Sequence, residues 1–172
     1  MNLPTWITVS RLVAIPLVFW LLANPTPEQR WWAVAVFLVA AGTDWLDGYL
    51  ARRLNQVTDL GKFLDPLVDK LLVLAPLMVL VQLGTVPAWG VFLILARELT
   101  IAGWRVGQAK IVGANMWGKV KTVVQISAIA LLISPLSQRY SLLVLGLFWV
   151  AVLLTWWSGL IYLTATGAGE EA

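Results

Sequence analysis

"TDWLDGYLARRLNQVTDLGKFLDPLVDK", residues 43–70, carries five of the nine acidic side chains in a chain of 172 residues. Long apolar stretches flank this segment on both sides. A carboxylate at membrane depth costs about 2.5–3.5 kcal/mol on insertion scales, and less near the interface. Because that cost is high, four regularly spaced aspartates between apolar stretches indicate a function: Asp44, Asp47, Asp65 and Asp69.

The composition is that of an integral membrane protein. Hydrophobic residues make up 60% of the chain and charged residues 12%, and the mean hydropathy is +0.83. A soluble domain is about half apolar and about a quarter charged. The chain has no cysteine and no histidine, which excludes disulfides, zinc–thiolate sites and histidine-dependent triads. Any metal is therefore expected to be a hard ion held by oxygen atoms, Mg²⁺ or Mn²⁺.

Six apolar stretches have about the length that a helix needs to cross the hydrocarbon core. They lie at residues 6–23, 31–50, 64–82, 87–107, 119–136 and 141–163. The predicted fold class is therefore all-α, a polytopic membrane protein with six transmembrane helices. The first stretch has no small-x-small cleavage site after it, so we expect it to be retained as a helix. One transmembrane domain, residues 1–166, is expected, with a disordered glycine-rich tail at residues 167–172.

Basic residues are distributed unevenly over the predicted connections. Only Arg30 and Arg139 fall toward one side of the membrane. Ten fall toward the other: Arg11, Arg52, Arg53, Lys62, Lys70, Arg97, Arg105, Lys110, Lys119 and Lys121. By the positive-inside rule, this side is cytoplasmic. Both termini and the acidic segment are therefore expected on the cytoplasmic face of the cell membrane.

The aspartates fall on two helical faces that also carry small residues. One face, with spacings of three, four and seven, holds Asp44, Asp47, Gly48 and Ala51. The next helix has an i, i+4, i+8 row of Gly61, Asp65 and Asp69. A short connection lets the two faces oppose each other in an antiparallel pair. Clustered carboxylates repel one another unless cations neutralise them, and one or two divalent ions suit phosphoryl-transfer chemistry.

Aspartates near a membrane surface can also serve roles that involve no catalysis. Exposed loop charges, or pairs with nearby basic residues, would account for one aspartate at an interface better than for four in two helical rows. A divalent-cation channel or transporter tends to place its binding residues near the bilayer midplane, between structural repeats. Here the acidic residues cluster toward one face and no repeat is visible. A non-catalytic scaffold would not require every reactive position to be intact.

The pattern Asp-x-x-Asp-Gly-x-x-Ala-Arg, eight residues, Gly-x-x-x-Asp-x-x-x-Asp resembles the signature of the CDP-alcohol phosphotransferase (CDP-alcohol phosphatidyltransferase) family. It runs from Asp44 to Asp69 without a departure at any specified position. Looser blocks resemble the bacterial branch whose acceptor is glycerol 3-phosphate. These blocks are "NLPTWITVSRLVAIP" (2–16), "TDWLDGYLARRLNQ" (43–56), "FLDPLVDK" (63–70), "ARELTIAGWR" (96–105) and "WGKVKTVVQ" (117–125).

The resemblance implies a role for each matching residue. A pair of Mg²⁺ or Mn²⁺ ions would be held by Asp44, Asp47 and Asp65, with a contribution from Asp69. Asp69 would also take the proton from the acceptor alcohol. Residues that would contact CDP-diacylglycerol are Gly48, Arg52, Thr58 and Gly61, with Ile7, Thr8, Ser10 and Arg11 from the N-terminal segment. The family is typically homodimeric, and no nucleic-acid partner is expected.

The implied reaction is displacement at phosphorus. An alkoxide formed from the 1-hydroxyl of glycerol 3-phosphate attacks the phosphorus that bears diacylglycerol, and CMP leaves. The acceptor's phosphate needs a cationic seat, for which the candidates are Arg97, Arg105, Lys119 and Lys121. Alternatively, these lysines contact anionic lipid headgroups, and Arg97 pairs with Glu98. Inositol phosphate would need the same cations, so charge alone does not exclude that acceptor.

Overall fold

The computed structural model describes the backbone of residues 3–54, 59–106 and 116–167, and the side chains of residues 9–43, 66–104 and 116–164. Thr58 and residues 168–172 of the expected tail lie outside the described residues. The described ranges are helical and contain no strand. The helices are Leu3–Ala23 (α1), Pro27–Leu54 (α2), Asp59–Gln82 (α3), Ala88–Val106 (α4), Met116–Ile133 (α5), Leu136–Arg139 (α6) and Ser141–Gly167 (α7).

The predicted all-α class is confirmed for these ranges, and each of the six apolar stretches forms a long helix. The main differences lie around the acidic segment. α2 ends at Leu54 instead of residue 50, and α3 begins at Asp59 instead of residue 64. Apolar composition alone set the predicted boundaries, whereas the helices continue through the charged turns on either side of their connection.

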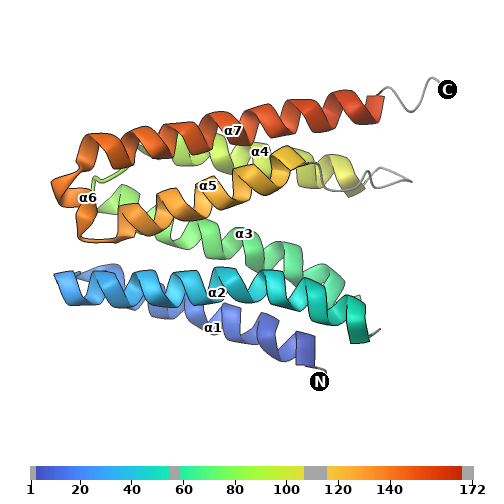
Figure 1. Ribbon diagram of the computed structural model, residues 1–172, viewed down its shortest axis with the longest axis horizontal. Helices are drawn as coiled ribbons and strands as arrows, with labels where there is room; N and C mark the ends of the chain where they lie inside the picture. The colour runs from blue at the N-terminus through green and yellow to red at the C-terminus, as the bar shows by residue number, and fades with distance from the viewer. Residues whose placement is uncertain (1–2, 55–58, 107–115, 168–172) are drawn as a thin grey trace.

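The long helices lie side by side in a bundle (Figure 1). α1 packs against α2 and α3, and α7 packs against α4 and α5. Contacts of α5 with α2 and α3, and of α3 with α4, join these two groups. The start of α1, the end of α2 and the end of α7 lie at the same end of the bundle (Figure 1). The segment that carries the aspartates is therefore at the end where α1 begins and α7 finishes.

A capping box, a glycine in a turn and one long-range hydrogen bond define several of the helix ends. At the start of α2, the Thr26 N–H donates to Gln29 Oε1 (2.9 Å), and the Gln29 N–H donates to Thr26 Oγ1 (3.2 Å). This reciprocal pair is a capping box. Gly84, between α3 and α4, has φ +68°, a left-handed conformation that favours glycine. Arg30 Nη1 donates to the carbonyl of Ile133 (3.2 Å) and so ties the start of α2 to the end of α5.

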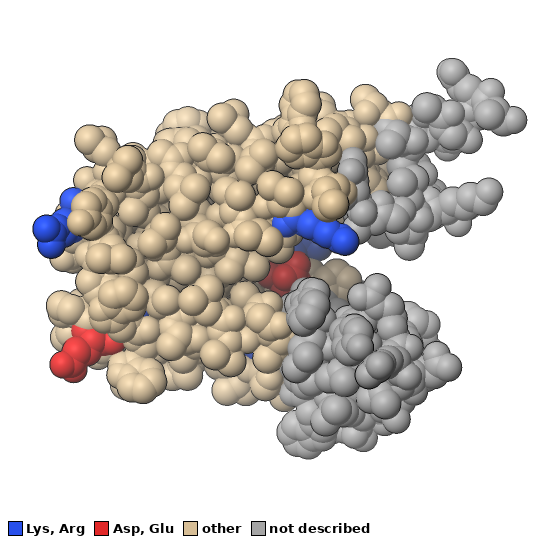
Figure 2. Space-filling view, viewed as in Figure 1, with Lys and Arg blue, Asp and Glu red and all other residues tan. Residues whose placement is uncertain are grey.

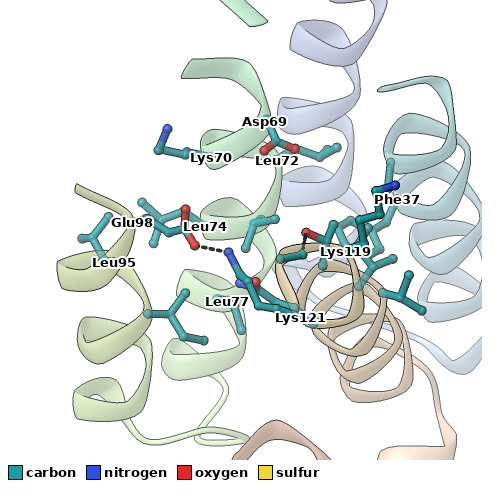
Figure 3. Close-up of a pocket in the computed structure, with 18 residues that line it drawn as sticks. Phe37, Asp69, Lys70, Leu72, Leu74, Leu77, Leu95, Glu98, Lys119 and Lys121 are labelled. Carbon is teal, nitrogen blue, oxygen red and sulfur yellow. Dashed lines mark hydrogen bonds and ion pairs between the residues drawn. The ribbon is translucent and has the colours of Figure 1, made fainter. Parts of the chain in front are cut away.

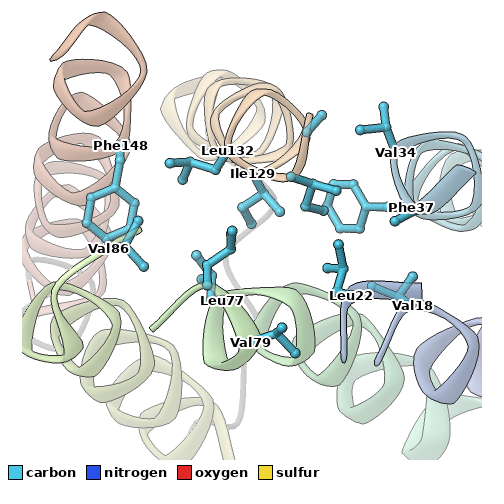
Figure 4. Packing of buried hydrophobic residues seen from close by; sticks show 14 of the residues in the cluster. Val18, Leu22, Val34, Phe37, Leu77, Val79, Val86, Ile129, Leu132 and Phe148 are labelled. Carbon is cyan, nitrogen blue, oxygen red and sulfur yellow. The ribbon is translucent and has the colours of Figure 1, made fainter. Parts of the chain in front are cut away.

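A continuous apolar core holds the two groups of helices together (Figure 4). Its fully buried side chains come from α1, α2, α3, α5 and α7 and include Leu22, Phe37, Leu77, Ile129, Leu132 and Phe148. Gly90 brings α4 close to α7, because a Cβ atom at this position would lie 2.7 Å from Phe148 Cε1. This packing fixes the positions of the helices that surround the functional residues.

The surface has membrane character. Within the described ranges, Met116–Ile133 and Ser141–Thr164 are long and apolar enough to cross a membrane. Large apolar side chains are exposed around the bundle, including Trp20, Phe92 and Leu142. In the space-filling view, the charged side chains lie mainly at two ends of the described surface, with a wide uncharged band between them (Figure 2). The six-span layout and the cytoplasmic position of the termini stay predictions.

Candidate active site

The acidic motif is carried by two consecutive helices. Asp44, Asp47, Gly48 and Arg52 lie in α2, and Gly61, Asp65 and Asp69 lie in α3. The end of α2 and the start of α3 are joined by a connection of only four residues, 55–58. This topology brings the two halves of the motif to the same end of the bundle. The side chains of residues 44–65 lie outside those that the structure describes.

Asp69, the last motif residue, lines a cavity of about 610 Å³ between α2, α3, α4 and α5. The other charged residues that line it are Lys70, Glu98, Lys119 and Lys121 (Figure 3). The rest of the wall is mainly apolar, with Phe37, Leu72, Leu77 and Ile94 among its residues. Asp69 and Lys119 are exposed, whereas Lys121 is only 8% exposed. The cavity is therefore accessible at the side of Asp69 and Lys119 and has a buried cation in its wall.

Glu98 connects cations from two helices. Lys121 Nζ on α5 donates a hydrogen bond to Glu98 Oε1 and forms a salt bridge with it. Arg97 Nη1 on α4 donates to the same oxygen at 3.1 Å. Arg97 Nη2 also donates to Ser158 Oγ on α7 at 2.8 Å. We call these four residues, Ser158, Arg97, Glu98 and Lys121, the Glu98 network.

The four candidate residues for the acceptor's phosphate have different surroundings. Lys119 and Lys121 both line the cavity, together with Asp69. Arg97 is not among the residues that line it, and it makes the ion pair with Glu98 that its sequence position suggested as an alternative role. Arg105 lies in α4, with its side chain outside the described set. Which of them bind phosphate stays a prediction.

The N-terminal candidates lie on α1. Ser10 and Arg11 line a second cavity of about 350 Å³ between α1 and α2, which also has Thr43 in its wall. Thr43 directly precedes Asp44, so this cavity approaches the start of the acidic motif. Arg11 is 1% exposed. Ile7 and Thr8 belong to α1, and their side chains are outside the described set.

Some residues around the main cavity were not predicted from the sequence. Three of them, Gly118, Thr122 and Gln125, share one face of α5 with the predicted Lys121, at spacings of three, four and seven. This small and polar face in an otherwise apolar helix was a detectable signal, because residues at such spacings lie on one side. Lys70 also lines the cavity, and its Nζ donates to the Pro66 carbonyl at 3.2 Å. No local pattern announces Ser158, which joins the Glu98 network from α7.

The chemistry of the motif fits a divalent metal. It contributes four carboxylates from two neighbouring helices, in a chain that has neither cysteine nor histidine. Oxygen donors of this kind are the preferred ligands of Mg²⁺ and Mn²⁺. No group of three potential metal ligands occurs among the described side chains, which include Asp69 but not Asp44, Asp47 or Asp65.

Comparison with known proteins agrees with the motif. The family model described as CDP-alcohol phosphatidyltransferase matches residues 1–157, most of the chain. The chain belongs to this family. The resemblance drawn from the acidic motif is therefore confirmed.

Similar proteins cover most of the chain. A Bacillus subtilis (strain 168) protein is 43% identical over 147 residues, which cover 77% of this chain and 76% of the relative. Proteins of Escherichia coli (strain K12) and Shigella flexneri are each 40% identical over an alignment of 176 positions, which covers 97% of this chain and 96% of the relative. All three relatives are named CDP-diacylglycerol–glycerol-3-phosphate 3-phosphatidyltransferase.

Proposed function

We propose that the protein transfers the phosphatidyl group of CDP-diacylglycerol to glycerol 3-phosphate, giving phosphatidylglycerophosphate and CMP. Family membership and the names of relatives at 40–43% identity support this reaction in phospholipid biosynthesis. The observation that carries the proposal is the cavity in which Asp69, the last residue of the family motif, faces the same space as Lys119 and Lys121. It combines a proton acceptor with cations suited to a phosphate-bearing alcohol.

Asp69 acts as the general base. Its carboxylate takes the proton of the acceptor's 1-hydroxyl group, and the alkoxide oxygen forms a bond to the phosphorus that bears diacylglycerol. The bond from that phosphorus to the CMP oxygen breaks, and CMP leaves with the electron pair. The exposed position of Asp69 on the cavity supports this role, because the proton can then pass to solvent.

Asp44, Asp47, Asp65 and Asp69 would hold two divalent ions, Mg²⁺ or Mn²⁺, which would supply positive charge to offset that of the donor's pyrophosphate. The remaining motif residues orient the donor. Gly48 and Gly61 leave space for the CDP group, Arg52 pairs with a phosphate, and Thr58 contacts the nucleotide. Ile7, Thr8, Ser10 and Arg11 on α1 close over it. The family match over residues 1–157 supports these assignments, since it spans every one of these positions.

The acceptor's phosphate is bound by cations of α4 and α5. Lys119 is exposed at the cavity, and Lys121 is buried in its wall. A phosphate dianion between them receives charge-assisted hydrogen bonds from two directions. Arg105, eight residues after Arg97 in α4, adds a further cation, whereas Arg97 contributes through its ion pair with Glu98. This arrangement favours an acceptor that carries a phosphate over a neutral alcohol.

In this account the chain is a six-span protein of the cell membrane, a homodimer with both termini in the cytoplasm. The ten-to-two distribution of basic residues supports this orientation. The placement of the α1 start and the α7 end at one end of the bundle is consistent with it (Figure 1). The acyl tails of the donor stay in the lipid, while its headgroup meets the soluble acceptor at the cytoplasmic surface.

The test is an assay of the purified protein in detergent micelles with CDP-diacylglycerol, Mg²⁺ or Mn²⁺, and a panel of acceptors. The panel contains glycerol 3-phosphate, inositol phosphate, serine and glycerol, and mass spectrometry identifies the lipid products. We expect phosphatidylglycerophosphate as the main product, with little product from the acceptors that lack a phosphate. Preferential use of inositol phosphate would keep the reaction class and reject the proposed acceptor. Transfer to none of the acceptors would reject the function.

A further inference from the structure

We propose that Glu98 is a positioning residue, which holds the Lys121 ammonium group in the cavity wall for the acceptor's phosphate. This inference rests on the proposed function and adds to it a specific cause of acceptor recognition. Glu98 and Lys121 both line the cavity, and Lys121 donates its hydrogen bond to Glu98 Oε1 (Figure 3). Arg97, which does not line the cavity, donates to the same oxygen.

A buried lysine needs a partner such as Glu98 to hold its ammonium group where it can bind the acceptor's phosphate. Lys121 is 8% exposed, and a flexible four-carbon stem gives its ammonium group no fixed position. An ammonium group has three N–H donors. Among the described residues, Glu98 accepts a hydrogen bond from one of them. The Glu98 carboxylate therefore fixes Nζ and leaves donor capacity for phosphate oxygens.

The charge balance of the Glu98 network also suits a phosphate. One carboxylate lies between Lys121 and Arg97, so the three ionised groups together keep one positive charge. Without the carboxylate, the cations of Arg97 on α4 and Lys121 on α5 would repel each other, and Lys121 would lose its fixed position. Glu98 thus compensates part of the charge and still leaves a cationic wall for a dianion.

A third helix supports the network from behind. Arg97 Nη2 donates to Ser158 Oγ on α7, and the next residue of α7 is Gly159. A Cβ atom at Gly159 would lie 2.9 Å from Arg97 Nε, so the absence of a side chain there makes room for the guanidinium group. Gly159→Ala therefore displaces Arg97 without altering a residue of the cavity. Gly146→Ala on the same helix is the matched control, because a Cβ atom at Gly146 meets nothing within 4 Å.

The experiment compares the KM values for glycerol 3-phosphate and CDP-diacylglycerol in Glu98→Gln and the wild-type protein. Glutamine keeps the shape of the side chain and removes its charge. Because a hydrogen bond to a charged group is about twice as strong as a neutral one, we expect the KM for glycerol 3-phosphate to rise about tenfold. The KM for CDP-diacylglycerol should change by less than about twofold. Glu98→Asp keeps the charge and should therefore raise the KM for glycerol 3-phosphate less than Glu98→Gln does.

A double-mutant cycle shows whether Glu98 acts through Lys121. If it does, Glu98→Gln combined with Lys121→Ala has the same KM for glycerol 3-phosphate as Lys121→Ala alone. Additive effects of the two substitutions would overturn the inference. Gly159→Ala should raise the same KM, while Gly146→Ala leaves it unchanged. The comparison of Gly159→Ala with Gly146→Ala tests the inference even if Glu98→Gln does not yield folded protein.

The outcomes separate this inference from the proposed function. Wild-type protein that does not use glycerol 3-phosphate rejects the function, and this inference with it. If the wild-type protein uses that acceptor, equal KM changes for both substrates in Glu98→Gln reject the inference alone. A lower unfolding temperature of Glu98→Gln with both KM values unchanged also rejects the inference alone, because Glu98 would then have only a structural role.

Discussion

Lys119→Ala and Lys121→Ala test how the protein recognises its acceptor, because these lysines are two residues apart on α5 and differ in burial. A hydrogen bond that involves a charged group contributes about 1.5–3 kcal/mol, equal to about 10- to 150-fold in affinity. Lys119 is exposed, so solvent screening places its effect near the lower limit. We expect Lys119→Ala to raise the KM for glycerol 3-phosphate about tenfold. Its stability should change by less than about 0.5 kcal/mol.

Lys121→Ala should affect both substrate recognition and stability. In the wild-type protein the Lys121 ammonium group is buried and paired with Glu98. Removal of one partner from a buried pair costs about 3–5 kcal/mol. Glu98 keeps its contact with Arg97 in the variant, so we expect a smaller loss of about 2–3 kcal/mol. The KM for glycerol 3-phosphate should rise at least as much as in Lys119→Ala.

Steady-state kinetics in mixed micelles, with each substrate varied in turn, measures the two KM values, and denaturant unfolding in detergent measures stability. In both variants we expect a large change in the KM for glycerol 3-phosphate and a small change in the KM for CDP-diacylglycerol. Equal changes for the two substrates in Lys119→Ala would refute it, because this lysine would then act on the donor or on the fold. Unchanged stability of Lys121→Ala would refute the energetic importance of the Glu98 pair.

Three further predictions concern the base, the metal and the packing of the bundle. Asp69→Asn should remain folded and release almost no CMP, as measured by nucleotide chromatography; substantial CMP release would remove Asp69 as the base. Chelation of divalent ions should abolish transfer, and Mg²⁺ or Mn²⁺ should restore it, whereas transfer that persists after exhaustive chelation contradicts the proposed metal dependence. Gly90→Ala should destabilise the protein by about 1–3 kcal/mol, because its Cβ would lie 2.7 Å from a Phe148 ring atom. Gly103→Ala in the same helix meets nothing within 4 Å and is the control; equal unfolding midpoints for these two variants would contradict the packing argument.

The sequence was sufficient to predict the six long helices, but not the short α6, and it predicted the end of the bundle that carries the motif. Apolar stretches of membrane-spanning length correspond to the six long helices, because their length and composition are local properties. The i, i+4 spacing that leads to Asp69, and the cationic residues on later helices, also predicted a shared site. The structure places Asp69, Lys119 and Lys121 around one cavity.

Features that depend on how distant helices pack were not predictable from local patterns. The sequence suggested that Glu98 pairs with Arg97, its neighbour in the chain. It did not specify that Lys121 shares the same carboxylate, because that contact depends on how the fold places α4 and α5 around one cavity. Ser158 is still further from Arg97 in the sequence, and a serine in an apolar helix has no local pattern that identifies its partner. The need for a glycine at position 159 was likewise not predictable, because it arises only from the packing of Arg97 against this position.

In the proposed reaction, the acceptor's own hydroxyl oxygen attacks the phosphorus of the lipid donor and displaces CMP. The most direct test uses glycerol 3-phosphate labelled with ¹⁸O in its 1-hydroxyl group, followed by mass spectrometry of the lipid and nucleotide products. We expect the heavy oxygen to be retained in phosphatidylglycerophosphate, with CMP unlabelled and formed in equal amount. Loss of the label from the lipid product, or its appearance in CMP, would rule out this direct displacement.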